Sequence, residues 1–92
     1  MTRSSNSQQK SVTQRQIHRR LSGHIHNISS VINMDIQYKN TKNTKQFILL
    51  WEDNNGIRHK EKGHYTQQCV DHVIRNVYKE LDISCRGLKL FI

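Results

Sequence analysis

Four residues in the second half of the chain have side chains that can bind zinc or act as nucleophile and base: His59, His64, Cys69 and His72. Zinc sites are built from close pairs such as Cys-x-x-Cys or His-x-x-x-His, and neither pair joins these residues. Cys69 and His72 resemble a nucleophile and its base by type alone, since a Cys on an apolar helix face is more often inert packing. We therefore expect no metal, no cofactor and no enzymatic activity.

Basic side chains give a stronger signal, because they are unevenly spread along the sequence. The 92-residue chain has a formal net charge of +8, and residues 1–34 carry five basic side chains without an acidic one. An acid-free third is typical of a protein with a polyanionic partner, such as nucleic acid, an anionic membrane surface or an acidic protein. The alternative is that the charge only keeps the protein soluble.

The first cluster of cations lies in residues 39–45, where Lys39, Lys42 and Lys45 recur at every third position with Asn and Thr between them. Phosphates require cations and hydrogen-bond donors in no particular order, so this segment can follow a nucleic-acid backbone. A solvated hairpin loop is an equally good interpretation of the same residues.

A second cluster lies on a predicted helix, where Arg15 and Arg19 are one turn apart and Arg20 flanks them. Two such arginines repel each other unless an anion lies between them, although they can also form a plain solvated face. Tyr65 is the aromatic residue that we expect to be exposed and able to stack on a base, whereas Trp51 fits a core.

Residues 1–11 are polar and basic without apolar periodicity, which is typical of a disordered arm. Residues 13–16 then fit a capping box, and Ile17, Leu21, Ile25 and Ile28 follow at helical spacing. The pattern predicts a helix over residues 14–30. Gly23 is its weakest point, because Gly disfavours helix interiors.

Three strands should follow the helix. Residues 32–39 alternate apolar and polar side chains, as in a half-buried strand, whereas residues 46–52 are nearly all apolar, as in a central strand covered on both faces. The Asn55-Gly56 pair after them favours a type I′ hairpin. Residues 57–62 are mostly charged, which suits an exposed edge strand.

A second amphipathic helix is predicted from about residue 65 or 66 to residue 81, with Val70, Val73, Ile74, Val77 and Leu81 along its apolar stripe. Residues 88–92 are apolar and form either a short fourth strand or a docking segment. The sequence thus predicts one small α+β domain over residues 12–92, with a three-stranded antiparallel sheet flanked by two helices.

The α-β-β-β-α order over about residues 13–81 is similar to that of double-stranded RNA-binding domains and of the small Alu-binding proteins of signal recognition particles. The former open their second helix with a Lys-Lys-x-Ala-Lys run that grips phosphates. Residues 63–68 occupy that place here and read Gly-His-Tyr-Thr-Gln-Gln, without Lys or Ala. The resemblance therefore concerns the order of elements and assigns no family.

We expect a sequence-tolerant nucleic-acid-binding module, for RNA or DNA, that contacts phosphates through the two basic clusters and Tyr65. A small protein-interaction module that binds an acidic protein is the alternative. Either one is compatible with a homodimer formed through the sheet edge or the C-terminal segment. The absence of a signal-peptide pattern and of a long apolar run favours a cytoplasmic protein without a membrane partner.

Overall fold

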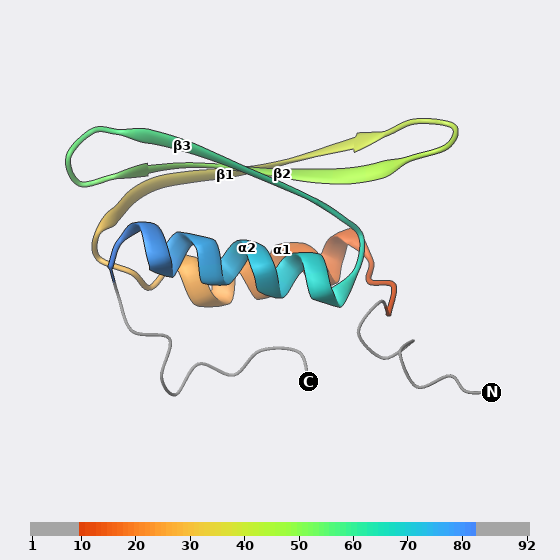
Figure 1. Cartoon of the computed structure of the whole chain (residues 1–92), viewed down its shortest axis with the longest axis horizontal. Helices are drawn as coiled ribbons and strands as arrows, with labels where there is room; N and C mark the ends of the chain where they lie inside the picture. Colours follow the sequence, from red (N-terminus) through yellow and green to blue (C-terminus); the bar gives the residue numbers. More distant parts are fainter. Residues whose placement is uncertain (1–9, 83–92) are drawn as a thin grey trace.

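The computed structural model describes residues 10–82, which form a three-stranded antiparallel sheet lying over two helices (Figure 1). The elements follow one another as α1 (Gln14–Ile25), β1 (Val31–Asn40), β2 (Lys45–Asp53), β3 (Arg58–His64) and α2 (Gln67–Glu80). The strand order β1-β2-β3 places β2 in the centre of the sheet. The predicted α+β class and α-β-β-β-α order are confirmed. Most of the expected basic arm, Cys85 and the apolar segment 88–92 lie outside the described residues.

Helix α1 begins at the predicted capping box but ends earlier than predicted, at Ile25 instead of residue 30. Thr13 Oγ1 accepts the backbone N–H of Gln16, whose side chain in turn accepts the backbone N–H of Thr13. The chain leaves the helix through two tight turns, in which Ile28 N–H donates to the Ile25 carbonyl oxygen. Ile28 still packs against the core from this turn. The apolar spacing in the sequence therefore extends beyond the end of the helix.

Strand β1 contains an irregularity that reverses the expected exposure of one residue. The register shifts by one residue between Val31 and Asn33, so that Ile32 has no partner on β2. This is the geometry of a β-bulge, which adds one residue to a strand. Met34 and Ile36 pack against the core as the alternation predicted, whereas Ile32 is 59% exposed.

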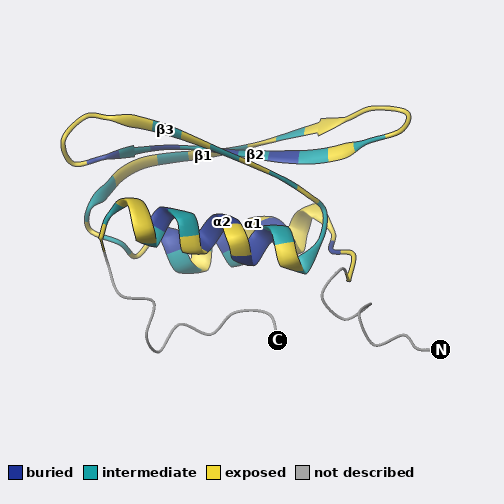
Figure 2. Cartoon of the chain, in the orientation of Figure 1, coloured by how far each residue is buried: buried dark blue, intermediate teal, exposed yellow. Residues whose placement is uncertain are grey.

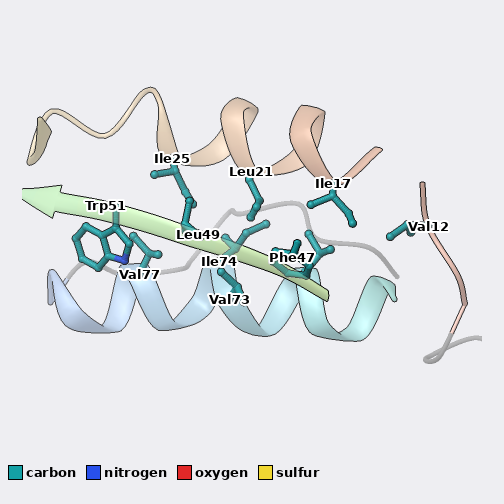
Figure 3. Packing of buried hydrophobic residues seen from close by; sticks show 11 residues of the cluster. Val12, Ile17, Leu21, Ile25, Phe47, Leu49, Trp51, Val73, Ile74 and Val77 are labelled. Atoms are coloured by element: carbon teal, nitrogen blue, oxygen red, sulfur yellow. The ribbon is translucent and has the colours of Figure 1, made fainter. Parts of the chain in front are cut away.

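The core lies between the sheet and the two helices (Figure 3). It consists of eleven residues: Val12, Ile17, Leu21, Ile25, Phe47, Leu49, Trp51, Val70, Val73, Ile74 and Val77. Strand β2 supplies its large side chains at alternate positions, and the residues between them are only half-buried. Within residues 10–82 the helices cover one face of β2 and nothing covers the other, contrary to the prediction of cover on both faces. Ile48 and Leu50 make the centre of this second face apolar.

The turn between β2 and β3 differs from the predicted type I′ hairpin. Gly56 N–H donates to the Asp53 carbonyl oxygen, and Asp53 N–H donates to that of Ile57. Among residues 10–82 only Gly56, at φ 82°, and Asp82 have positive φ, so Asn55 does not adopt the left-handed conformation that a type I′ turn needs. The loop is thus one residue longer, with Gly56 alone in the left-handed position.

Strand β3 includes Gly63, where the sequence predicted its end, and runs to His64. At Gly63 the strand lies too close to the core for a side chain. A Cβ atom at Gly63 would lie 2.8 Å from the Phe47 ring and 2.9 Å from the Cβ atom of Cys69. Helix α2 begins at Gln67, with Thr66 as its N-cap accepting the N–H of Cys69. Gly63 therefore brings β3 and the start of α2 close to β2.

Candidate nucleic-acid interface

The sheet has one face without helices, and alternate residues of its strands form four rows across that face. Both helices lie against the opposite face (Figure 1). The strand pairing gives the rows Asn33–Glu52–Arg58, Asp35–Leu50–Lys60, Gln37–Ile48–Lys62 and Lys39–Gln46–His64. We call this surface the open face. Within the described part of the chain nothing covers it.

Strand β3 separates its charged side chains between the two faces of the sheet. Its helix-facing residues His59 and Glu61 are partly buried and reach α2. Asn76 Nδ2 donates to Glu61 Oε1 at 3.3 Å, and His59 Nδ1 lies 3.9 Å from Glu80 Oε2. The residues between them point to the open face and are exposed, as the alternating exposure of β3 in Figure 2 shows. The sequence of β3 is charged nearly throughout. On one face of the strand the polar side chains contact α2, and on the other face the cations are exposed.

Arg58, Lys60 and Lys62 form the cationic side of the open face. Alternate residues of a strand lie about 6.8 Å apart, so the three side chains form a regular line along the sheet edge. Within residues 10–82 no carboxylate lies within 4.0 Å of the cationic group of any of these three residues. Unpaired cations on an exposed line are what a phosphate backbone contacts.

The open face is not uniform along its length. Half-buried Ile48 and Leu50 occupy its centre. Its two acidic residues, Asp35 and Glu52, stand in the two rows nearest the β2–β3 turn. The remaining two rows carry lysine, histidine and glutamine without an acid. An apolar centre beside an acid-free basic end suits an elongated polyanion that also offers apolar surface.

The three lysines predicted as one cluster lie in three different places. Lys39 belongs to the open face, in the row of Gln46 and His64. Lys42 is exposed in the four-residue loop between β1 and β2, which closes with Thr41 N–H donating to the Thr44 carbonyl oxygen. Lys45 is paired with Asn40 and lies one residue along the strand from the open face, on the helix side. The three lysines therefore do not form one line that a single nucleic-acid backbone could contact.

The arginines of α1 lie on the far side of the molecule from the open face. Arg15 and Arg19 are exposed on α1, opposite the buried stripe of Ile17, Leu21 and Ile25. Arg20 is half-buried. Since α1 lies under the sheet, these side chains and Lys39 are separated by the thickness of the core (Figure 1). The structure therefore does not bring the two predicted clusters together.

Tyr65 joins three elements through its hydroxyl group. The hydroxyl accepts a hydrogen bond from Gln14 Nε2 and donates one to Asn40 Oδ1, both at 2.9 Å. Its ring meets that of Tyr38 edge-on, with 6.1 Å between centroids, and burial together with this neighbour raises the pKa of Tyr38. Lys10 and Ser11, the last residues of the expected arm, pair here with residues 67 and 66. Tyr65 is thus half-buried where α1, β1 and α2 meet.

Two titratable side chains in contact, those of Asp53 and His59, stabilise the β2–β3 turn. Asp53 Oδ1 accepts the backbone N–H groups of Asn55 and Ile57, and Oδ2 lies 2.9 Å from His59 Nε2. These hydrogen bonds, that of His59 first, hold the pKa of Asp53 below its ordinary value. The His59 ring stacks on Trp51, with 4.0 Å between centroids. In residues 10–82 no group of three His, Cys, Asp or Glu side chains can hold a metal ion.

Sequence reasoning took residues 57–62 only as an exposed edge strand and missed Arg58, Lys60 and Lys62 as a surface. The signal was present, because the three cations recur with the period of a strand and so must share one face. The face itself could be identified only once the structure showed where the helices lie.

Comparison of the chain with protein-family models, with curated proteins and with solved structures found no match. The function must therefore be argued from the surface itself. Neither helix in residues 10–82 is both long enough and apolar enough to span a membrane.

Proposed function

We propose that the protein binds nucleic acid through the open face of its sheet. The observation that carries the proposal is the separation of charge on β3. Its residues Glu61 and His59 interact with α2, whereas Arg58, Lys60 and Lys62 have no carboxylate partner among the described residues and lie on the face without helices. Lys39 and His64 extend this basic surface across the sheet, and Lys42 extends it to the adjoining loop. Ile48 and Leu50 provide apolar contact between the cations.

The chemistry of the open face indicates that binding depends little on sequence. Lysine contacts phosphates as a point charge, and phosphate contacts position a nucleic acid without reading its bases. The four rows contain no Phe, Tyr or Trp on which bases could stack. Affinity should therefore come mainly from released counterions and fall steeply with salt.

Fluorescence anisotropy with labelled single-stranded and duplex RNA and DNA, over a series of salt concentrations, tests this proposal. We expect Lys60→Gln/Lys62→Gln to weaken binding and to reduce the slope of log K against log salt by about 1.4–1.8, the value for two lost phosphate contacts. Arg15→Gln/Arg19→Gln removes the same charge from the opposite side of the molecule. This matched control should leave the slope nearly unchanged.

Two results would contradict the proposal. If the helix pair reduces the slope and the strand pair does not, the nucleic acid binds on α1 and the open face has another role. If no probe binds even at low salt, the partner is not nucleic acid, and an acidic protein becomes the candidate for the same basic surface.

A further inference from the structure

The outer edge of β1 lacks charges like those on β3, which oppose the addition of another strand at the opposite edge of the sheet. Edge strands usually resist the addition of another strand by carrying several charges, lysine above all. Strand β3 has three cations on its open side, whereas the regular part of β1 has only Asp35 and Lys39 there, of opposite sign. This edge is therefore long and nearly neutral, and no other strand of residues 10–82 pairs with it.

The backbone groups available on this edge follow from the β1–β2 loop. Thr41 N–H donates to the Thr44 carbonyl oxygen at 2.7 Å. Hydrogen-bonded and non-hydrogen-bonded pairs alternate along an antiparallel ladder, so the odd-numbered residues of β1 bond to β2. The N–H and C=O groups of Met34, Ile36, Tyr38 and Asn40 therefore point outward. Beside them, α1 and residues 31–36 line a groove of about 630 Å³.

We propose that two copies of this protein pair through β1, antiparallel, with Gln37 of one copy opposite Gln37 of the other. Two features limit the pairing to residues 34–40, namely the bulge at Ile32 and the loop that begins at Thr41. A two-fold axis through the centre of this stretch passes through Gln37. The proposal needs no polyanion and so does not depend on nucleic-acid binding.

The charges of β1 select the same register. With Gln37 on the axis, Asp35 of each copy lies directly opposite Lys39 of the other, on the open face, in a non-hydrogen-bonded pair where side chains are closest. Ile36 and Tyr38 face each other on the helix side. An axis through Ile36 would place Asp35 opposite Gln37, and one through Asp35 would oppose two carboxylates. Only the Gln37 register pairs opposite charges twice.

Sedimentation equilibrium on the full chain tests the proposal with charge reversals on the exposed side of β1. We expect a dimer for the natural sequence. Asp35→Lys and Lys39→Asp should each raise its dissociation constant about tenfold, because each opposes like charges at two positions. The double variant Asp35→Lys/Lys39→Asp restores both pairs and should restore the dimer. Circular dichroism checks that each variant keeps the fold.

The variants also distinguish the effect of the Asp35–Lys39 pairs on dimerisation from the effect of the net charge of the protein. If repulsion between two basic copies were the controlling factor, Lys39→Asp would strengthen the dimer, whereas the proposed pairing predicts that it weakens it. Arg75→Asp makes the same change of charge on the exposed side of α2 and should not weaken dimerisation. A monomer at all concentrations, or a dimer insensitive to Asp35→Lys and Lys39→Asp, would overturn the proposal.

Cysteine cross-linking examines the register directly. In a Cys69→Ser/Cys85→Ser background, Gln37→Cys should form an intermolecular disulfide on oxidation, since the two Cβ atoms of a non-hydrogen-bonded pair are about 4.5 Å apart, within reach of a disulfide. Lys39→Cys alone should not cross-link, but a mixture with Asp35→Cys should. Cross-linking of Lys39→Cys with itself would show a different register and refute this one.

Discussion

Gly63 and Gly23 should respond in opposite ways to replacement by alanine, one losing and the other gaining free energy of unfolding. At Gly63 a methyl group would overlap the Phe47 ring and the Cβ atom of Cys69, whereas at Gly23 nothing lies within 4 Å. We expect Gly63→Ala to destabilise the protein by about 1–3 kcal/mol through overpacking. Gly23→Ala should stabilise it by about 0.5–1 kcal/mol through helix propensity.

Urea unfolding of both variants, followed by circular dichroism, measures the two effects on one scale. Gly23→Ala controls for the generic effect of replacing glycine, since it lies exposed in α1. An unchanged stability for Gly63→Ala would mean that β3 can move away from β2 at little cost. The close contact would then not determine how β3 and α2 are placed.

Asp53 should make the stability of the β2–β3 turn depend on pH. Its pKa is lower in the folded protein than the ordinary value of 3.8, chiefly through the hydrogen bond with His59. Its contribution is therefore complete above about pH 5 and is lost as the pH falls through 3.8 and below. Asp53→Asn should lower the melting temperature at neutral pH and reduce the loss of stability on acidification. Thermal melts between about pH 7 and pH 3 provide the measurement, and parallel pH profiles for the two proteins would contradict it.

At the scale of the element, α1 depends on a cap that the sequence identified correctly. Thr13 and Gln16 exchange two hydrogen bonds, of 3.2 and 2.9 Å, at the start of the helix. Thr13→Ala removes the hydroxyl acceptor and should cost about 1 kcal/mol of unfolding free energy. Thr13→Ser keeps the acceptor and should stay within a few tenths of a kcal/mol of the natural protein in urea unfolding. Equal losses for Ala and Ser would show that the hydroxyl group is not what stabilises this end.

Local signals of this kind predicted the elements, whereas their ends depended on contacts between distant residues. Apolar periodicity identified α1 and α2, because the same face meets the core over several turns. It extended α1 too far, since Ile28 reaches that core from a turn. The glycine at position 63 also predicted the end of β3, whereas the role of Gly63 depends on Phe47 and Cys69. Neither contact can be derived from the residues that are adjacent in the sequence.

The candidate site was harder to predict than the fold, because it depends on which face of the sheet the helices cover. Continuous apolar residues in β2 suggested cover on both sides, although its buried apolar residues, Phe47, Leu49 and Trp51, all lie on the helix-facing side. The period of the strand places the three cations of β3 on one face, but without the position of the helices that face could not be identified as the one they leave open. Spacing in the sequence grouped Lys39 with Lys45, yet the pleat of the strands places them on opposite faces.

At the scale of the whole molecule, dimerisation and nucleic-acid binding would reinforce each other. Pairing through β1 joins two open faces into one six-stranded surface with a β3 strand at each outer edge. Neighbouring strands lie about 4.8 Å apart, so five spacings separate the two cationic edges by about 24 Å. A nucleic acid long enough to reach both would bind with a large gain from effective concentration.

The dependence of affinity on probe length therefore distinguishes a joined surface from two independent ones. We expect the affinity of the natural protein for single strands of about 4 to 20 nucleotides to rise steeply once a probe can span about 24 Å, at about 3.4 Å or more per nucleotide. Asp35→Lys adds positive charge but weakens the dimer, so it should bind short probes at least as well and lose the steep rise. If the natural protein is dimeric and both proteins show the same gradual dependence on length, the two faces act separately. A steep rise that persists in the monomeric variant would place the second contact within a single copy.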